Sequence, residues 1–264
     1  MIAMPLACTG IRVAYGRRTA IDGVSLSLQR GEIRALIGPN GSGKSTALHV
    51  LAGLIVPSAG TVEIDGRPLR GIARRALARR LAFLPQQPAA PEEMTVERLA
   101  LQRRFAHVGL LRGYRAADHQ AVRWALESTG LAGLAARPLR ELSGGERQRA
   151  WIAATLAQEA EILLLDEPTS FLDIGHQAEV LDLLARLAHE RGVTVAMAIH
   201  DIDQAMAVAD RIALLEAGQL VFDGSPHDLA RSGLVEKVFR VNGRFVLLEP
   251  SGALHFDVPL RQRP

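Results

Sequence analysis

Hydrophobic positions in the first part of the chain recur with the short period of β-strands. Gly10–Tyr15, Val24–Leu28 and Ile33–Ile37 are short apolar segments separated by Gly-Arg-Arg and Gln-Arg-Gly turns, a pattern typical of strands. Thr61–Ile64 precedes an Asp-Gly pair, which favours a hairpin arm. The pattern predicts a strand-rich N-terminal region.

The periodicity changes further along the chain. Residues 95–158 follow a helical pattern, most clearly over Asp118–Thr129, where apolar residues recur at helical spacing. Ile162–Leu165 and Thr194–Ile199 are then uninterrupted apolar runs, with a helical segment over Gln177–His189 between them. Such runs are typical of parallel strands that are buried on both faces. We therefore expect a strand–helix–strand core that is interrupted by a helical insertion.

Composition narrows the class of protein. Of the 264 residues, 48% are hydrophobic and 22% charged, which is an ordinary globular balance and excludes extensive disorder. The formal net charge of +3 is too small to predict a nucleic-acid partner without a clustered basic face. The single cysteine, Cys8, cannot form an internal disulfide, and we expect it to be buried in the first strand.

The start of the chain has no basic segment followed by a long apolar stretch, so we do not expect a signal peptide. No apolar run reaches the roughly 18 residues needed to cross a bilayer. Any attachment to a membrane is therefore expected to come from a partner chain.

The segment from Gly38 to Ser45 fits the phosphate-loop pattern G-x-x-x-x-G-K-[ST] and opens a helix-like stretch over Ser45–Leu54. Glycines allow backbone N–H groups to face an anion, and the helix N-terminus favours negative charge. Lys44 would bring a positive charge to the β- and γ-phosphates, and the Ser45 hydroxyl would bind Mg²⁺. The alternative is a glycine-rich turn without a ligand. The predicted nucleotide-binding residues are Gly38, Pro39, Asn40, Gly41, Ser42, Gly43, Lys44, Ser45 and Thr46.

Two carboxylates, Asp166 and Glu167, follow the apolar run that begins at Ile162. A Mg²⁺ site requires one carboxylate at such a strand end, which fits Asp166. Hydrolysis requires a base that positions water for in-line attack on the γ-phosphate, which fits Glu167. An acidic pair after a strand is by itself also compatible with a simple turn, but beside a phosphate loop it predicts an ATPase.

A third motif lies at Leu142–Gln148. Ser143 and Glu146 have the spacing of a capping box, which predicts a helix start. Gly144 and Gly145 lie just inside this helix, where each glycine costs about 1 kcal/mol relative to alanine. N–H groups exposed at a helix start can bind a second phosphate, and such binding would offset the cost.

These motifs, in this order, resemble the ATP-binding subunit of an ABC transporter over nearly the whole chain, and Leu142–Gln148 resembles the ABC signature. The resemblance implies an α/β fold: a P-loop NTPase core with a mainly parallel sheet, an N-terminal antiparallel β subdomain and an inserted helical subdomain. It implies one ABC ATPase domain over 1–264, with subdomains at 1–90, 91–158, 159–240 and a C-terminal extension at 241–264.

The resemblance also implies that two copies of the chain pair head to tail, with ATP and Mg²⁺ between the phosphate loop of one copy and the signature of the other. Signature residues would then serve the ATP of the partner copy. The residues in this group are Ser143, Gly144, Gly145 and Glu146.

Four further positions match family roles. Gln86 resembles the glutamine that touches Mg²⁺ and water, and His200 the histidine that contacts the γ-phosphate. Tyr15 resembles the aromatic residue that stacks on adenine, and Asp173 the aspartate of the D-loop. Taken singly, Gln86, His200 and Tyr15 could be a loop glutamine, a strand-end histidine and a core tyrosine. Phe171 stands where the D-loop commonly has a small residue.

Finer resemblance, in Leu172–Gln177 and His200–Ala205 among other segments, is to the ATPases of ferric-siderophore and ferric-citrate importers. It implies two membrane permease subunits, a binding protein outside the membrane, and a place on the cytoplasmic face of the cell membrane. The permease contact is expected at about Pro85–Leu111, although apolar residues such as Met94 and Leu99 could instead be core. No residue of these motifs touches the cargo.

Several alternatives stay open at this point. Importers of heme or cobalamin and ABC exporters share the same motifs, whereas a soluble P-loop kinase would not need Leu142–Gln148. ABC ATPases that act on DNA or ribosomes are a further class, although we expect no nucleic acid. The tract Arg67–Arg80, with six arginines, is either a solvated surface or a site for anionic lipid or nucleic acid.

The end of the chain is expected to form a trailing hairpin on the core, with short strands at Phe245–Leu248 and His255–Val258. His49 and His255 have no companion at metal-ligand spacing, so we expect both to be structural.

Overall fold

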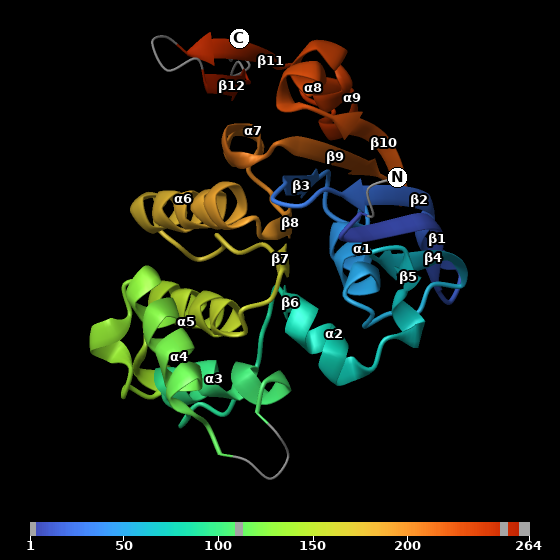
Figure 1. Cartoon of the computed structure of the whole chain (residues 1–264). Helices are drawn as coiled ribbons and strands as arrows, with labels where there is room; N and C mark the ends of the chain where they lie inside the picture. Colours follow the sequence, from blue (N-terminus) through green and yellow to red (C-terminus); the bar gives the residue numbers. More distant parts are fainter. Residues whose placement is uncertain (1–3, 109–112, 249–252, 259–264) are drawn as a thin grey trace.

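The computed structural model describes residues 4–108, 113–248 and 253–258. Its centre is a six-stranded sheet in the order β10-β9-β3-β8-β7-β6 (Figure 1). The strands β9, β3, β8, β7 and β6 are parallel, and β10 pairs antiparallel with β9. Their bounds are β3 Ile33–Ile37, β6 Leu81–Leu84, β7 Ile162–Asp166, β8 Thr194–Ala198, β9 Arg211–Glu216 and β10 Gln219–Gly224.

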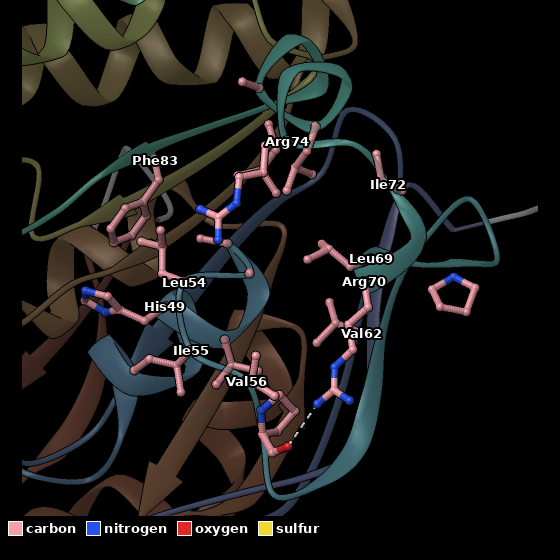
Figure 2. A pocket seen from close by; sticks show the side chains of 18 of the residues that line it. His49, Leu54, Ile55, Val56, Val62, Leu69, Arg70, Ile72, Arg74 and Phe83 are labelled. Carbon is pink, nitrogen blue, oxygen red and sulfur yellow. Dashed lines mark hydrogen bonds between the residues drawn. The ribbon is translucent and has the colours of Figure 1, made fainter.

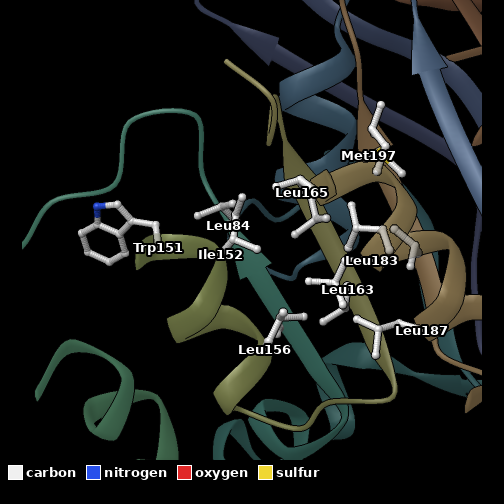
Figure 3. Packing of buried hydrophobic residues seen from close by; sticks show 14 of the residues in the cluster. Leu84, Trp151, Ile152, Leu156, Leu163, Leu165, Leu183, Leu187 and Met197 are labelled. Atoms are coloured by element: carbon white, nitrogen blue, oxygen red, sulfur yellow. The ribbon is translucent and has the colours of Figure 1, made fainter. Parts of the chain in front are cut away.

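Both faces of this sheet are covered. Successive residues of a strand point to opposite faces, so Leu163 and Leu165 of β7 belong to one buried cluster and Leu164 to another. Figure 3 shows Leu163 and Leu165 between side chains from α5 and α6. The opposite face packs on α1 and on the N-terminal sheet. These helices span α1 Lys44–Leu51, α5 Gly144–Ala157 and α6 Ile174–Arg191.

The N-terminal region is an antiparallel sheet in the order β2-β1-β4-β5. Cys8 on β1 is 4% exposed, and burial raises the pKa of its thiol to about 11. The predicted hairpin arm is β4, which turns through Asp65 and Gly66, both with positive φ, into β5. The bounds are β1 Leu6–Tyr15, β2 Arg18–Leu28, β4 Ala59–Ile64 and β5 Arg67–Pro68.

A group of helices follows β6 (Figure 1, green to yellow). Met94 and Leu99 are buried in the larger cluster, so these two residues are core and not contact surface. Buried Arg104 holds the group together, because its Nε donates to Asp118 Oδ1 at 2.9 Å and a terminal nitrogen donates to the Ala157 carbonyl at 2.9 Å. The elements are α3 Val96–Arg103, α4 Ala116–Ser128 and α5, with short 3₁₀ turns at Arg104–Ala106, Ala132–Leu134 and Leu139–Glu141.

The basic tract links this helical group to the rest of the chain. It covers β5, a 3₁₀ turn at Leu69–Gly71 and the helix α2, Arg74–Arg80. Arg75 and Arg79 both donate to the Ala106 carbonyl, at 3.0 and 2.8 Å. At least two of the six arginines therefore have a structural role at a 3₁₀-helix end, where carbonyls lack partners.

After β8 the chain forms α7, Ile202–Val208, then β9, β10 and the helices α8 Pro226–Ser232 and α9 Leu234–Phe239. The strand pair β11 Arg244–Leu248 and β12 Ala253–Asp257 is the predicted terminal hairpin. β12 packs on α7, and the His255 ring nitrogen lies 2.6 Å from Asp203 of that helix. The sequence interpretation found the hairpin but not β9, β10, α8 or α9.

No helix among the described residues is both long and apolar enough to cross a membrane. We propose that the subdomain boundaries lie at residues 90, 158 and 240. Each element that the structure describes between residues 90 and 158 is helical, which supports the first two boundaries.

Candidate active site

Four adjacent strands end at the same edge of the central sheet, and each is followed by predicted site residues. The phosphate loop follows β3, Gln86 follows β6, Asp166 ends β7 with Glu167 directly after it, and His200 follows β8. Because these strands are parallel neighbours, their carboxyl ends lie side by side, which is where open α/β sheets bind ligands. Residues that are up to 162 positions apart (38 to 200) thus share one edge.

The phosphate loop has a backbone that only glycine accommodates at two positions. Gly38 has φ +144°, and a Cβ there would lie 2.1 Å from the Leu215 carbonyl oxygen. Gly43 has φ +108°, and its Cβ would lie 2.6 Å from the Ala20 carbonyl oxygen. The loop is therefore pressed against β9 and β2, which leaves its opposite side for an anion.

Lys44 begins α1 and is 5% exposed. Its Nζ donates to the carbonyls of Gly38 at 2.8 Å and Pro39 at 3.2 Å, so the ammonium is held inside the loop. Burial lowers the pKa of Lys44, and the negative charges of Glu167 and Asp166 act in the opposite direction. Within the part of the chain that the structure describes, the hydrogen-bond partners of this buried cation are carbonyls, so Lys44 is well placed to bind an anionic phosphate.

Asp166 is 1% exposed, and its Oδ1 accepts a hydrogen bond from Ser45 Oγ at 3.0 Å. Burial raises the pKa of Asp166, and the Ser45 hydrogen bond opposes this shift. A hydroxyl and a carboxylate at this distance provide the hard oxygen ligands that Mg²⁺ prefers. In the described part of the chain no cluster of three His, Cys, Asp or Glu residues is arranged for a metal. Mg²⁺ is usually bound through one or two carboxylates together with phosphate oxygens.

Glu167 has a left-handed backbone with φ +54°, a conformation that costs energy for a non-glycine residue. Its backbone N–H donates to the Ala198 carbonyl of β8 at 3.1 Å. Its carboxylate accepts from Ser170 Oγ at 3.1 Å and contacts the Nε2 atom of His200. The structure thus brings the predicted base and the predicted histidine into direct contact, with the base oriented by two partners.

The signature residues begin α5. Ser143 Oγ accepts from the Glu146 N–H at 3.2 Å, and Glu146 Oε2 accepts from the Ser143 N–H at 2.8 Å, so the predicted capping box is confirmed. Gly145 lies beside the D-loop, because a Cβ there would be 3.6 Å from the Phe171 carbonyl oxygen. In the ranges described, the side-chain hydrogen bonds of Ser143 and Glu146 join these residues to each other and not to the phosphate loop of the same chain.

Three further predicted residues, Gln86, Tyr15 and Asp173, are exposed. Gln86 is at the β6 end of the site edge, and Tyr15, 54% exposed, is at the β1–β2 turn, so it is not a core residue. Asp173 caps α6 by accepting from the His176 N–H at 2.9 Å, and this hydrogen bond lowers the pKa of Asp173. Phe171 has φ +66° and is 77% exposed, so the D-loop presents an aromatic ring on its surface.

Sequence reasoning missed two residues that shape the site. Gln148 of α5 is 6% exposed, and its Nε2 donates to the Pro168 carbonyl at 3.0 Å. Ser170 orients Glu167, as described above. The sequence signal for Gln148 was its position three residues beyond the capped glycine pair. Its burial, which requires a hydrogen-bond partner for the amide, is a finding of the structure. Nothing in the local pattern pointed to Ser170.

This geometry is typical of the nucleotide site of a P-loop ATPase. A family model described as ABC transporter matches residues 21–170, and the chain belongs to the ABC transporter family. The fold, the relatives and the family together make it an ATP-binding cassette, that is, an ATPase.

The chain is 38% identical over 250 residues to the ferric enterobactin transport ATP-binding protein FepC of Escherichia coli (strain K12), covering 95% of this chain and 92% of that protein. It is 42% identical to the petrobactin import ATP-binding protein FpuD of Bacillus anthracis (88% and 85% covered) and 42% identical to the hemin import ATP-binding protein HmuV of Streptomyces coelicolor (88% and 82% covered).

Among solved structures, a metal-chelate type ABC transporter in an inward-facing conformation matches with a TM-score of 0.84 and 29% identity, covering 98% of both chains. A dimeric bacterial ABC transporter cassette matches with a TM-score of 0.76 and 27% identity, covering 84% of this chain and 98% of that one. These findings confirm the predicted α/β P-loop fold and the predicted family.

Replacing Glu167 with glutamine keeps the size of the side chain but removes its basicity. We expect the rate of ATP hydrolysis to fall about a hundredfold or more, while ATP still binds. Phosphate release and equilibrium binding of a fluorescent ATP analogue measure the two properties separately. Hydrolysis at the wild-type rate in Glu167→Gln would show that Glu167 is not the base.

Replacing Asp166 with asparagine is expected to separate folding stability from activity. The pKa of Asp166 is raised in the folded chain, so the ionised carboxylate destabilises the nucleotide-free fold. This destabilisation is complete above the folded pKa and disappears as pH falls from the folded pKa towards the lower pKa of the unfolded chain. Asparagine retains an acceptor for Ser45 Oγ. We expect Asp166→Asn to melt above wild type at about pH 8, to converge with it towards about pH 4, and to lose Mg²⁺-dependent hydrolysis. Thermal denaturation without nucleotide measures the first effect, and a lower melting temperature at about pH 8 would contradict it.

Proposed function

We propose that this chain is the ATP-hydrolysing subunit of an importer for metal chelates, most specifically ferric siderophores or ferric citrate. The observation that carries the proposal is the set of relatives whose names specify transport of ferric enterobactin, iron(3+)-hydroxamate, petrobactin and achromobactin. These relatives are 38–42% identical to this chain and cover 86–95% of it. The site geometry supports the ATPase part of the proposal, and the relatives support the cargo.

The proposed chemistry assigns one task to each group at the site edge. Lys44 and the loop N–H groups bind the β- and γ-phosphates, and Ser45, Asp166 and Gln86 hold Mg²⁺, which neutralises phosphate charge when bound. Glu167 accepts a proton from the attacking water. His200 donates a hydrogen bond to the γ-phosphate. Because His200 also contacts Glu167, the phosphate-binding imidazole and the base are held in a fixed position relative to each other.

ABC ATPase cassettes form dimers, and we propose that two copies of this chain pair head to tail around ATP. The exposed start of α5 supports this pairing, because its capped glycines make no hydrogen bond to their own phosphate loop within the described ranges. Ser143 to Glu146 of one copy would then face the γ-phosphate on the other, Tyr15 would stack on adenine, and Asp173 would lie at the contact between the copies.

A groove of about 720 Å³ lies between the end of α1, β4, α2 and the end of β6. Figure 2 shows Leu54, Arg74 and Phe83 converging on one side of it. Leu54 is 58% and Val56 66% exposed, and such an exposed apolar surface indicates a partner. Pro85 and Arg103, which also line the groove, belong to the expected permease contact at Pro85–Leu111; residues 109–111 lie outside the described residues.

We propose that this groove receives a cytoplasmic segment of the permease that carries apolar and acidic side chains. The arginines that line the groove, Arg70, Arg74 and Arg103, support an acidic partner. This assignment places the chain on the cytoplasmic face of the cell membrane, attached to two permease subunits that are supplied by an external binding protein. No nucleic acid is required.

Uptake of radiolabelled ferric chelates tests the cargo. Cells that lack this chain are complemented with wild type or with Lys44→Ala, and we expect only wild type to restore uptake, because Lys44 is the buried cation of the phosphate loop. Hemin and cobalamin are included in the panel, since one relative is a hemin import protein. Normal ferric uptake in the deletion strain, with no second importer present, would overturn the ferric assignment, and selective loss of hemin uptake would replace it.

Introducing an acidic residue into the groove tests the permease contact. Leu54→Asp places a negative charge beside the proposed acidic segment, so we expect the membrane-bound fraction of the chain and the uptake rate to fall about tenfold. Hydrolysis by the isolated chain should stay within twofold of wild type. Leu247→Asp on β11, where Leu247 is 56% exposed, is the matched control. Unchanged membrane binding in Leu54→Asp would contradict the assignment of the groove.

A further inference from the structure

A chain of hydrogen bonds between one hydroxyl and two side-chain amides joins the loop of the proposed base to two helices. Thr169 Oγ1 donates to Gln204 Oε1 at 3.0 Å, and Gln204 Nε2 donates to Gln177 Oε1 at 2.8 Å. Gln177 Nε2 then donates to the backbone carbonyls of Thr169 at 3.3 Å and Leu172 at 3.1 Å. The three side chains come from the loop after β7, from α6 and from α7.

The order of donors and acceptors in this chain of hydrogen bonds is set at the Gln177 end, because the Thr169 hydroxyl at the other end can donate or accept. Gln177 faces two carbonyl oxygens, so its amide nitrogen must point towards them and its oxygen towards Gln204. Gln204 must then present its nitrogen to Gln177 and its oxygen to the Thr169 hydroxyl. Only a side chain with an acceptor and a donor at one end can satisfy both neighbours, which a carboxylate or an apolar residue cannot do.

The two segments that Gln204 connects carry the proposed catalytic pair. Thr169 is two residues after Glu167, and its side chain is nearly buried at 8% exposed. Gln204 lies in the first turn of α7, where its N–H donates to the capping carboxylate of Asp201 at 3.1 Å. Asp201 directly follows His200. A single side chain therefore spans from the His200 segment to the Glu167 loop.

We infer that Gln204 is a positioning residue for ATP hydrolysis, which holds the segment that carries His200 in register with the loop that carries Glu167. Gln177 and Thr169 are its two partners in this role. Gln204 does not itself reach the reacting atoms and acts through the contact between His200 and Glu167. The inference rests on the catalytic roles proposed above for these two residues.

The fold of α7 does not depend on Gln204 alone. On the side of the terminal hairpin, Asp203 accepts from the Phe256 N–H at 2.7 Å and pairs with His255 at 2.6 Å. Ala205 and Met206 of the same helix are buried in the larger cluster. Loss of the amide chain is thus expected to leave α7 folded and to alter only its registration against the Glu167 loop.

The test is steady-state hydrolysis by the full-length chain with Gln204→Met, which keeps the length of the side chain and removes both hydrogen bonds. We expect kcat to fall about tenfold or more, since small misplacements of reacting groups have effects of this size or larger. KM for ATP should stay within twofold, and the melting temperature should change little. Gln219→Met, an exposed glutamine at the start of β10, is the matched control and should leave kcat unchanged.

Two double variants separate positioning from a general structural effect. Gln177→Leu should lower kcat in the same way as Gln204→Met, and the double variant should be no slower than the slower single variant, because coupled residues are not additive. In a His200→Ala background, measured by single-turnover hydrolysis, Gln204→Met should cause no further loss. An additive loss in either pair, or a KM effect without a kcat effect, would overturn the inference.

The result can be distinguished from failure of the proposed function. If Glu167→Gln or His200→Ala hydrolyses ATP at the wild-type rate, the catalytic assignment fails and Gln204 has no pair to position. If both are slow while Gln204→Met has wild-type kcat, the catalytic assignment stands and the role of Gln204 is wrong. Neither outcome depends on the cargo.

Discussion

The parallel alignment of β3, β8, β7 and β6 is the constraint on which the rest of this structure depends. Strands that are buried on both faces favour apolar side chains, so the polar groups of the site lie where these strands end. Because neighbouring parallel strands end together, the polar groups of four strands are gathered at one edge. The phosphate loop, the acidic pair and His200 are therefore neighbours as a consequence of how the hydrophobic core is built.

The electrostatics of the site follow from this position. Asp166 is the last residue of a buried strand and Lys44 the first of a helix packed on the sheet, so both charges lie mostly out of water. Burial disfavours both charged forms, raising the pKa of Asp166 and lowering that of Lys44. Phosphates and Mg²⁺ would supply the counter-charges that the two residues lack, so nucleotide binding is expected to stabilise the site as well as activate it.

The loop after β7 is held by hydrogen bonds from amides and hydroxyls. Gln148 holds the backbone after Glu167, Ser170 orients its carboxylate, and Gln204 connects the same loop to α7. Each of these groups comes from a different element, so a movement of α5 or α7 would be transmitted to the base.

Local patterns in the sequence predicted the class of fold and the candidate catalytic groups. The phosphate loop, the acidic pair and the capped glycines are local patterns with local physical causes, and the apolar runs of β7 and β8 favoured a buried parallel sheet. Which residues meet depends instead on the tertiary structure. It separated the buried Met94 and Leu99 from the exposed groove residues, gave Arg75 and Arg79 a structural role, and joined Thr169, Gln204 and Gln177. The physical reason is that hydrogen bonds between side chains distant in sequence depend on how elements pack, and hydrophobic periodicity records only which face of each element is buried.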